Sequence, residues 1–359
     1  MKTTHSFLSL LFCLLFEPLL GQQPTLERRI PVNPEAPIRI TQVDNRNNID
    51  VSGNFMMAGF PYAQNASGAN TGAVYAYERN PDGSWVQKQQ ITQDGGSYFG
   101  YYLSVSGDLA FIAGAKDKGE LYIYKRNANS GLWEDQKVTI NAAFLKNIST
   151  RFNLEGNLLT ISTGMHNVGT QVFRFNEADK TCTKVQELNP GFDVASDPEN
   201  GRIVLGGNSS TNQNVFSLYE LNAAGNQWGN LFRANSDKTL SFLGSEVAIG
   251  GDYFVLSPMR PQTIEGETDP VSGVVFQRQT NGGWAQRQYL SFGTEPVIRV
   301  IDMEMSENVL AIVGGTNVGS KTSWDNHYRL FAYKRTATGW DKLGNVSLPA
   351  GMNMFGRLA

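Results

Sequence analysis

A pair of short alternating strands joined by a tight turn recurs along the chain, and this repeat constrains the fold more than any other feature of the sequence. In most copies the turn is Gly-Asn or Gly-Asp, which is typical of a β-hairpin because these residues tolerate positive φ. The copies are residues 49–55 (IDVSGNF), 103–109 (LSVSGDL), 152–158 (FNLEGNL), 247–253 (VAIGGDY) and 303–309 (MEMSENV), with a looser one at 194–201 (VASDPENG).

Each hairpin is followed by two further strands. The third strand carries aromatic or aliphatic residues two positions apart, as in Tyr75/Tyr77 and Tyr122/Tyr124. The fourth begins at a tryptophan in five copies and at Cys182 in one; these positions are 85, 133, 182, 228, 284 and 340, which are 46 to 56 residues apart. Four strands at this spacing are typical of one blade of a β-propeller.

The sequence therefore predicts an all-β chain, a propeller of four-stranded antiparallel blades with six legible blades. The two ends leave the blade number open. Residues 38–42 resemble a fourth strand and residues 355–359 resemble a first strand. Together they could supply an incomplete seventh blade, or the chain could be a piece of a longer array.

Composition and charge exclude several classes of protein. The chain has 359 residues, of which 40% are hydrophobic and 18% charged, so disorder is not expected. Its 30 basic and 33 acidic residues give a net charge of −3, which argues against binding to nucleic acid.

The N-terminus has the features of a secretory signal peptide, which we place at residues 1–22. A lysine at position 2 precedes an apolar run from Phe7 to Phe16, which is too short to span a bilayer. Residues 23–36 are then an N-terminal extension, and residues 37–359 form a single propeller domain. We expect a secreted, extracellular protein with no membrane insertion. Because Cys13 lies in the signal peptide, Cys182 is expected to be a packing residue without a disulfide partner.

Several motifs resemble the FG-GAP repeats that form the head of integrin α-subunits. The resemblance rests on Phe99-Gly100, on Gly59-Phe60-Pro61 and Ala113-Gly114-Ala115, and on the endings from Tyr75 to Trp85 and from Tyr122 to Trp133. It implies a propeller in which the aromatic residue of each Phe-Gly pair packs between blades while the glycine permits close approach. Two blades also resemble Kelch repeats, through Gly206-Gly207 and Gly314-Gly315, and that family implies the same fold.

The calcium sites of integrin-like FG-GAP blades are not expected here. Such a site needs a loop with alternating carboxylates around a glycine, whereas most of the hairpin turns in this chain are too short to surround a cation. Asp44, Asn48 and Asp50 offer suitable oxygen atoms but no glycine turn. We therefore predict no metal and no cofactor.

The connections between second and third strands are long and variable, and a propeller places them on one face together with the connections between blades. Binding residues concentrate on such loops when a rigid scaffold holds them. The richest cluster is Trp324, Asp325, His327 and Tyr328, which we name as ligand-binding candidates. The alternative is that Trp324 packs against its own loop.

Four Asn-x-Ser/Thr sequons are candidate glycosylation sites if the chain passes through a eukaryotic secretory route. They begin at Asn65, Asn147, Asn208 and Asn345.

From these observations we expect a secreted, non-enzymatic recognition or adhesion module that binds an extracellular protein or glycan through its long-loop face, with no catalytic residues. Two alternatives remain: a propeller hydrolase or lyase acting on polysaccharide, and a structural component of an extracellular matrix. In a propeller enzyme the catalytic side chains come from different blades, so their spacing in the sequence does not reveal them. Buried Asp, Glu or Arg side chains converging at the mouth of the channel would favour the enzyme.

Overall fold

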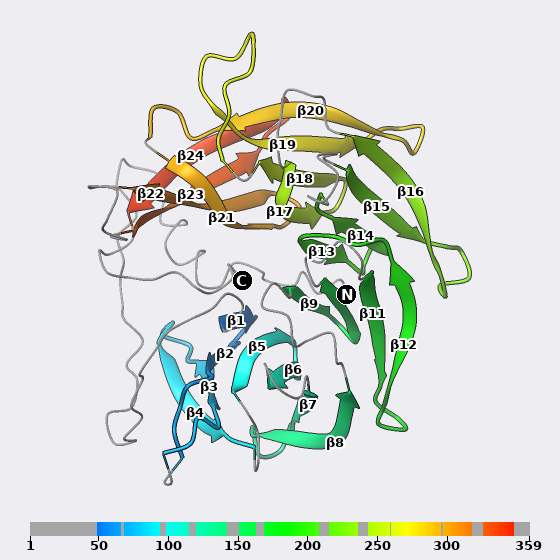
Figure 1. Cartoon of the computed structure of the whole chain (residues 1–359), viewed down its shortest axis with the longest axis vertical. Helices are drawn as coiled ribbons and strands as arrows, with labels where there is room; N and C mark the ends of the chain where they lie inside the picture. Colours follow the sequence, from blue (N-terminus) through cyan, green and yellow to red (C-terminus); the bar gives the residue numbers. More distant parts are fainter. Residues whose placement is uncertain are drawn as a thin grey trace.

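The computed structural model describes residues 49–65, 68–93, 98–114, 120–141, 151–162, 169–207, 215–235, 243–258, 260–295, 297–317 and 326–347. These residues form 24 strands and no helix. The strands make six four-stranded antiparallel sheets, each built from four consecutive strands. The sheets follow one another around a centre in chain order (Figure 1). The predicted β-propeller with six blades is confirmed. The segments 38–42 and 355–359, considered for a seventh blade, lie outside the described residues.

Blade 1 contains β1 (Ile49–Ser52), β2 (Phe55–Phe60), β3 (Ala73–Arg79) and β4 (Trp85–Ile91). Blade 2 contains β5 (Phe99–Ser106), β6 (Leu109–Gly114), β7 (Glu120–Arg126) and β8 (Trp133–Asn141). Blade 3 contains β9 (Arg151–Glu155), β10 (Leu158–Ser162), β11 (Thr170–Asn176) and β12 (Thr181–Leu188).

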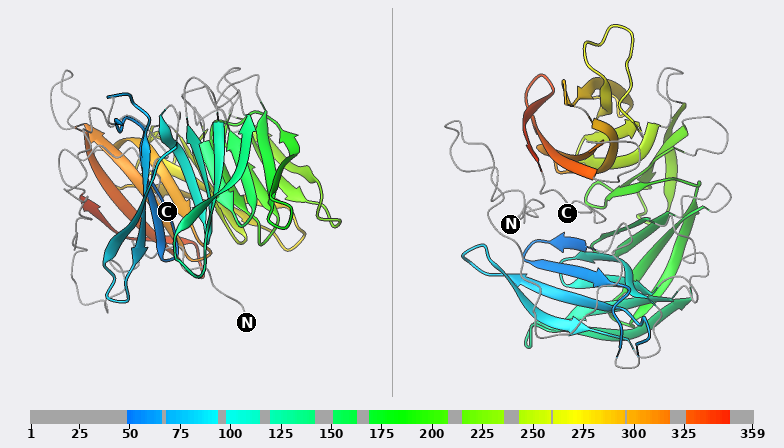
Figure 2. Two further views of the ribbon diagram at one scale, coloured as in Figure 1. Left: turned by 90° about the horizontal axis from the view of Figure 1, so that it is seen from below. Right: turned by 60° about the vertical axis from the view of Figure 1, so that its left-hand side comes forward.

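Blade 4 contains β13 (Val194–Asp197), β14 (Arg202–Leu205), β15 (Val215–Leu221) and β16 (Trp228–Asn235). Blade 5 contains β17 (Leu243–Gly250), β18 (Tyr253–Pro258), β19 (Val271–Arg278) and β20 (Trp284–Ser291). Blade 6 contains β21 (Val297–Met305), β22 (Val309–Asn317), β23 (Asn326–Arg335) and β24 (Trp340–Ser347). The first strand of each blade is the inner one, and the strands run from one face of the disc to the other (Figure 2).

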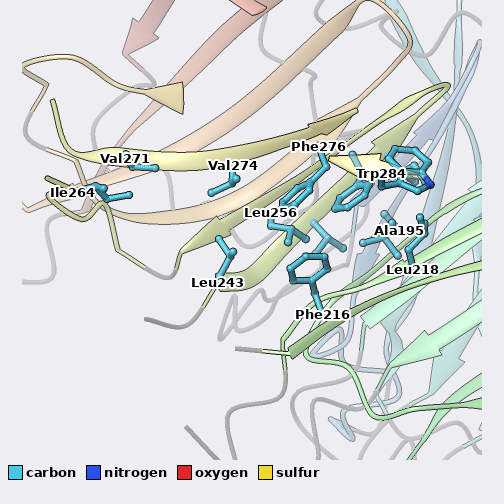
Figure 3. Close-up of a cluster of buried hydrophobic side chains, with 14 residues drawn as sticks. Ala195, Phe216, Leu218, Leu243, Leu256, Ile264, Val271, Val274, Phe276 and Trp284 are labelled. Carbon is cyan, nitrogen blue, oxygen red and sulfur yellow. The ribbon is translucent and has the colours of Figure 1, made fainter. Parts of the chain in front are cut away.

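The hydrophobic core lies between neighbouring blades. Between blades 4 and 5, Phe216 on β15 packs against Phe254 and Phe276, and the rings of Phe254 and Phe276 are stacked with centroids 4.7 Å apart. Trp284, which opens β20, completes this cluster (Figure 3). The aromatic residues of the third strands and the tryptophans of the fourth thus bury the faces of the sheets, as the repeat predicts.

Cys182 has the packing role expected from its place in the repeat. It lies at the start of β12, is half-buried, and packs against the apolar cluster between blades 2 and 3. Burial raises the pKa of the Cys182 thiol to about 12.

A glutamine side chain joins blades 5 and 6 at their outer strands. The Nε2 of Gln288 donates to the carbonyl oxygen of Trp340 at 2.9 Å, and the backbone N–H of Trp340 donates to Gln288 Oε1 at 2.8 Å. The same double hydrogen bond joins Gln89 to Trp133 and Gln186 to Trp228. It therefore links blade 1 to 2, 3 to 4 and 5 to 6.

The free edges of the inner strands donate hydrogen bonds to side chains of the preceding blade. Asp50 Oδ2 accepts from the backbone N–H of Val105 at 2.8 Å, and Ser104 Oγ accepts from that of Leu154 at 3.1 Å. An inner strand has one edge without a partner strand, so its N–H groups need such acceptors. Polar side chains consequently line one side of the inner strands, and the candidate site belongs to this set.

Candidate functional site

Four charged residues occupy the same level of the inner strands in blades 3 to 6. Arg151, Asp193 and Glu246 each lie four positions before the last residue of the inner strand, which is Glu155, Asp197 and Gly250 respectively, and Asp302 lies four positions before Ser306, the residue that follows β21. All four are buried, with 2% to 6% of their surface exposed. We call Arg151, Asp193, Glu246 and Asp302 the charged layer.

Three members of the charged layer are in direct contact. Nη2 of Arg151 lies 3.1 Å from Oε1 and 3.4 Å from Oε2 of Glu246, and its Nε lies 3.6 Å from Oδ1 of Asp193. Arg151 and Glu246 belong to blades 3 and 5, which are not neighbours. Side chains from non-neighbouring blades meet only near the axis of a propeller, so the charged layer lies at the central channel.

Backbone and hydroxyl groups hold the two carboxylate residues in place. Oδ2 of Asp193 accepts from the N–H of Val247 at 2.9 Å, which leaves Oδ1 directed toward Arg151. The N–H of Glu246 donates to the buried hydroxyl of Ser257 at 3.3 Å. The carboxylate of Asp193 is held directly, whereas the hydrogen bond to Ser257 holds the backbone from which Glu246 projects, and a catalytic or binding site requires groups held in place.

The charged layer lies toward the face that carries the long connections. Arg151 opens β9 and Asp193 immediately precedes β13, so both lie where the chain enters a blade. In an antiparallel sheet the second strand ends at the same edge where the first begins, so the connections from second to third strands lie at this end too. The sequence also predicted a site on this face, but from the loop residues around Trp324.

Buried carboxylates beside a guanidinium can support acid–base chemistry, in which the carboxylates exchange protons and the guanidinium supplies positive charge. A carboxylate in a water-poor site can take a proton from water, and a guanidinium beside it can stabilise an oxyanion that forms during the reaction. The described part of the chain contains no group of three or more His, Cys, Asp or Glu side chains arranged to hold a metal ion. Asp50, considered above for calcium, uses its carboxylate to accept from Val51, Ser104 and Val105.

The ligand-binding candidates named from the sequence do not form a described cluster. Trp324 and Asp325 lie outside the described residues, and His327 is placed only by its backbone in β23, where it pairs with Thr316. Tyr328 is 2% exposed within β23, because the strand begins two residues earlier than Tyr328 and turns this ring into the interior. Tyr328 is therefore a buried strand residue, whereas the sequence placed the ligand-binding candidates in a long loop.

The asparagines of two of the four sequons lie in the described structure. Asn65 is exposed in the β2–β3 connection, where its Oδ1 accepts from the N–H of Ala69. The side-chain amide of Asn345 lies on β24 between Arg329 and Glu295, with Nδ2 donating to Glu295 at 3.3 Å. Asn147 and Asn208 lie outside the described residues.

In blades 3 to 6 the sequence carries a signal for the charged layer, four positions before the residue that precedes the hairpin turn. In successive blades this position holds Arg151, Asp193, Glu246 and Asp302. It is distinct from the glycine turns and apolar positions that define the repeat, so the predicted site did not include it. The contacts of these residues could not be foreseen, since blades 3 and 5 are separated by a whole blade in the chain.

No protein-family model matches the chain, and no curated protein matches its sequence. Solved propeller structures are similar to it in fold. A protein from Lactobacillus plantarum aligns with a TM-score of 0.55 at 13% identity, covering 84% of each chain. A candidate 6-phosphogluconolactonase from Bacteroides uniformis aligns with a TM-score of 0.54 at 12% identity, covering 82% of this chain and 83% of the other. A periplasmic gluconolactonase from Pseudomonas aeruginosa aligns with a TM-score of 0.50 at 13% identity, covering 83% of this chain and 84% of the other.

These neighbours contradict the expectation of a non-enzymatic recognition or adhesion module. One of the three is described as a candidate 6-phosphogluconolactonase and another as a gluconolactonase, both of them enzymes, and each aligns with more than four-fifths of this chain. The charged layer is also the arrangement that we expected of an enzyme and not of a binding module. The prediction that the chain is not an enzyme is wrong. The expectation of no catalytic residues depended on that prediction, so it is no longer supported.

The structure adds one finding on membrane association. In the ranges described above, there is no helix long and apolar enough to cross a bilayer.

Proposed function

We propose that this protein is a hydrolase that opens a small carbohydrate lactone at the charged layer. The observation that carries the proposal is the contact of Arg151 with Asp193 and Glu246, which brings buried charges from three blades to the central channel. The resemblance in fold to the gluconolactonases supports the choice of a lactone.

Burial of the site favours a small substrate over a polysaccharide. The side chains of Arg151 and Glu246 are 7% and 8% exposed. A polymer chain would need its catalytic groups on an open surface along which the chain can lie. A small ring can be enclosed, and small-molecule sites are usually concave and bury most of the ligand.

In the proposed reaction Glu246 acts as the general base and Arg151 as the electrostatic catalyst. Glu246 takes a proton from a water molecule, and the water oxygen forms a bond to the carbonyl carbon of the lactone. The negative charge that develops on the carbonyl oxygen is stabilised by the guanidinium of Arg151. The bond from the carbonyl carbon to the ring oxygen then breaks, and the ring oxygen takes the proton from Glu246, which yields the open hydroxy acid. Asp193 keeps the guanidinium in position.

The test is hydrolysis of glucono-1,5-lactone by the purified chain, followed in a pH-stat against the spontaneous reaction. We expect catalysis by the natural protein and a loss of about 10²- to 10⁴-fold in kcat in Glu246→Gln, the range for removal of a general base. Glu220→Gln is the matched control, because Glu220 also pairs with a buried arginine, Arg202, at 3.4 Å but on β15. The control should retain full activity. Absence of catalysis with a panel of sugar lactones, or equal rates for the two variants, would refute the proposal.

Secretion through residues 1–22, glycosylation at the sequons, the absence of nucleic-acid partners and the FG-GAP resemblance remain predictions from the sequence. Mass spectrometry of the protein recovered from the medium of its source cells tests the first two, because cleavage lowers the mass of the chain and glycans raise it.

A further inference from the structure

Arg299 lies near the start of β21, the inner strand of blade 6, three positions before Asp302 of the charged layer. An inner strand enters its blade from the face that carries the long connections, so Arg299 lies between the charged layer and that face. Three residues of a strand span about 10 Å, and a bulge shortens this length. A six-carbon sugar derivative is of comparable length, so it can reach from the level of Asp302 to Arg299.

Arg299 and Asp302 lie on the same side of blade 6. Val300 and Met303 belong to the apolar cluster between blades 5 and 6, so they face blade 5. Side chains alternate along a strand, and Arg299 and Asp302 directly precede these two residues, so both face away from blade 5. The alternation is kept in step by one extra residue, Ile301, between Val300 and Asp302. Bulges of this kind re-aim side chains, and they are frequent next to active sites.

The guanidinium of Arg299 is half-buried and unpaired. Within the described ranges it takes part in no hydrogen bond, ion pair or ring contact. By contrast, Arg151 and Arg202, also on the inner two strands of their blades, each contact two carboxylates. A guanidinium that is partly removed from water gains charge-assisted hydrogen bonds when an anion binds, and its planar fork matches the oxygens of phosphate and carboxylate groups.

Gly315 gives the stem of Arg299 its place. The two residues are paired across β21 and β22. A Cβ at position 315 would lie 3.5 Å from Cγ of Arg299 and 3.2 Å from Cδ1 of Ile301, so these two side chains occupy the space that a larger residue would need. The stem is therefore held by packing, while the guanidinium at its end has no partner.

We propose, building on the proposed hydrolase function, that Arg299 binds an anionic group, a phosphate or a carboxylate, on the part of the lactone remote from the reacting carbonyl. Arg151 and Glu246 act on the carbonyl at the charged layer, and Arg299 holds the anionic end of the same molecule nearer the long-connection face. Fixing both ends orients the ring, and orientation of a bound substrate lowers the barrier to reaction.

The experiment compares kcat/KM for three lactones at neutral pH: glucono-1,5-lactone, its 6-phosphate, and glucaro-1,4-lactone, which carries a free carboxylate. We expect the natural protein to favour one of the two charged lactones, which identifies the anionic group. Arg299→Met should lower the kcat/KM for that lactone, relative to glucono-1,5-lactone, by at least about tenfold, because charge-assisted hydrogen bonds are lost. Arg299→Lys keeps the charge without the fork and should lose less.

Arg174 provides a matched control. It is also half-buried and unpaired within the described ranges, but it lies on β11, the third strand of blade 3. Arg174→Met makes the same change in charge and should leave the ratio of charged to neutral kcat/KM as it is in the natural protein. Equal changes of this ratio in the two methionine variants, or no change in either, would overturn the assignment to Arg299. If Arg299→Met does not fold, a ratio for Arg299→Lys equal to that of the natural protein would overturn it too.

Calorimetric titration with the open acids separates the anion site from the reaction. We expect the natural protein and Arg174→Met to bind 6-phosphogluconate or glucarate more tightly than gluconate, and Arg299→Met to lose this preference. That result without turnover of any of the lactones overturns the hydrolase function while the anion site at Arg299 stands. Turnover of the lactones with the same preference in all variants overturns the anion site and leaves the hydrolase function.

Discussion

Nη2 of Arg151 lies 3.1 Å from Oε1 of Glu246, although a whole blade separates their strands in the chain and around the ring. Asp193 of the intervening blade contacts the same guanidinium. The three residues therefore tie blades 3, 4 and 5 together at the channel, and the arrangement has consequences for stability as well as for the proposed chemistry.

Replacing Arg151 by methionine should destabilise the protein strongly. The change keeps most of the side-chain volume but leaves two buried carboxylates without their cation, and removing one partner of a buried ion pair costs about 3–5 kcal/mol. Urea unfolding of Arg151→Met checks this. The double variant Arg151→Met/Glu246→Gln should recover part of the loss, because one of the uncompensated charges is gone. A single variant as stable as the natural protein would show that the contact contributes little.

The contribution of each interblade glutamine to the free energy of unfolding should be measurable separately. Gln288→Ala removes both bonds to the backbone of Trp340 and should lower the free energy of unfolding by about 1–3 kcal/mol, since each contributes about 0.5–1.5 kcal/mol. Gln286→Ala, on the exposed side of the same strand, should change it by less than about 0.5 kcal/mol. Similar losses in both variants would assign the effect to strand propensity and not to the contact.

The close approach of blades 1 and 2 at Gly100 should tolerate no side chain. Gly100 has a φ of 85°, and an added Cβ would lie 2.8 Å from Val74 Cγ2 and 3.0 Å from the carbonyl oxygen of Ala73. We expect Gly100→Ala to cost at least about 3 kcal/mol, from backbone strain and overpacking together. Gly107→Ala is the control: Gly107 also has positive φ, but an added Cβ meets no atom within 4 Å, so only the strain of about 1–2 kcal/mol should appear. Equal losses, measured by urea unfolding, would mean that the approach is not tight.

The thiol of Cys182 should react with disulfide reagents only after unfolding. Burial raises its pKa from 9.0 to about 12, and since the thiolate is the reactive form, its population at pH 8 is about a thousandfold lower than that of an ordinary thiol. A chain from which Cys13 has been removed should therefore show negligible reaction at pH 8 when native and one reactive thiol in urea. The neutral thiol is favoured in the folded state, so this contribution to stability is complete below pH 9 and is lost as the pH rises through 12. Fast reaction of the native protein would contradict the buried position.

The repeat alone was enough to predict much of the fold. Tryptophan or cysteine at the start of each fourth strand, the paired aromatic residues of the third strands and the glycine turns all depend on local backbone geometry or on alternation along one strand. These features are visible in a single sequence, and the six sheets have their strands where the repeat placed them. The candidate site could not be predicted in the same way. Loop composition drew attention to Trp324 and its neighbours, while Arg151, Asp193 and Glu246 looked like ordinary residues of separate hairpins.

The sequence by itself determined the class of architecture, the order of the strands within each blade and the packing role of Cys182, because these follow from periodicity and from the conformational needs of glycine. The tertiary structure decided which charged side chains meet. Arg151 and Glu246 are 95 residues apart and meet only because the ring brings the entry points of their inner strands to a common axis. Charged residues that are far apart in the sequence form a site only when the blades close around the channel and exclude water from it. That closure depends on how all six sheets pack.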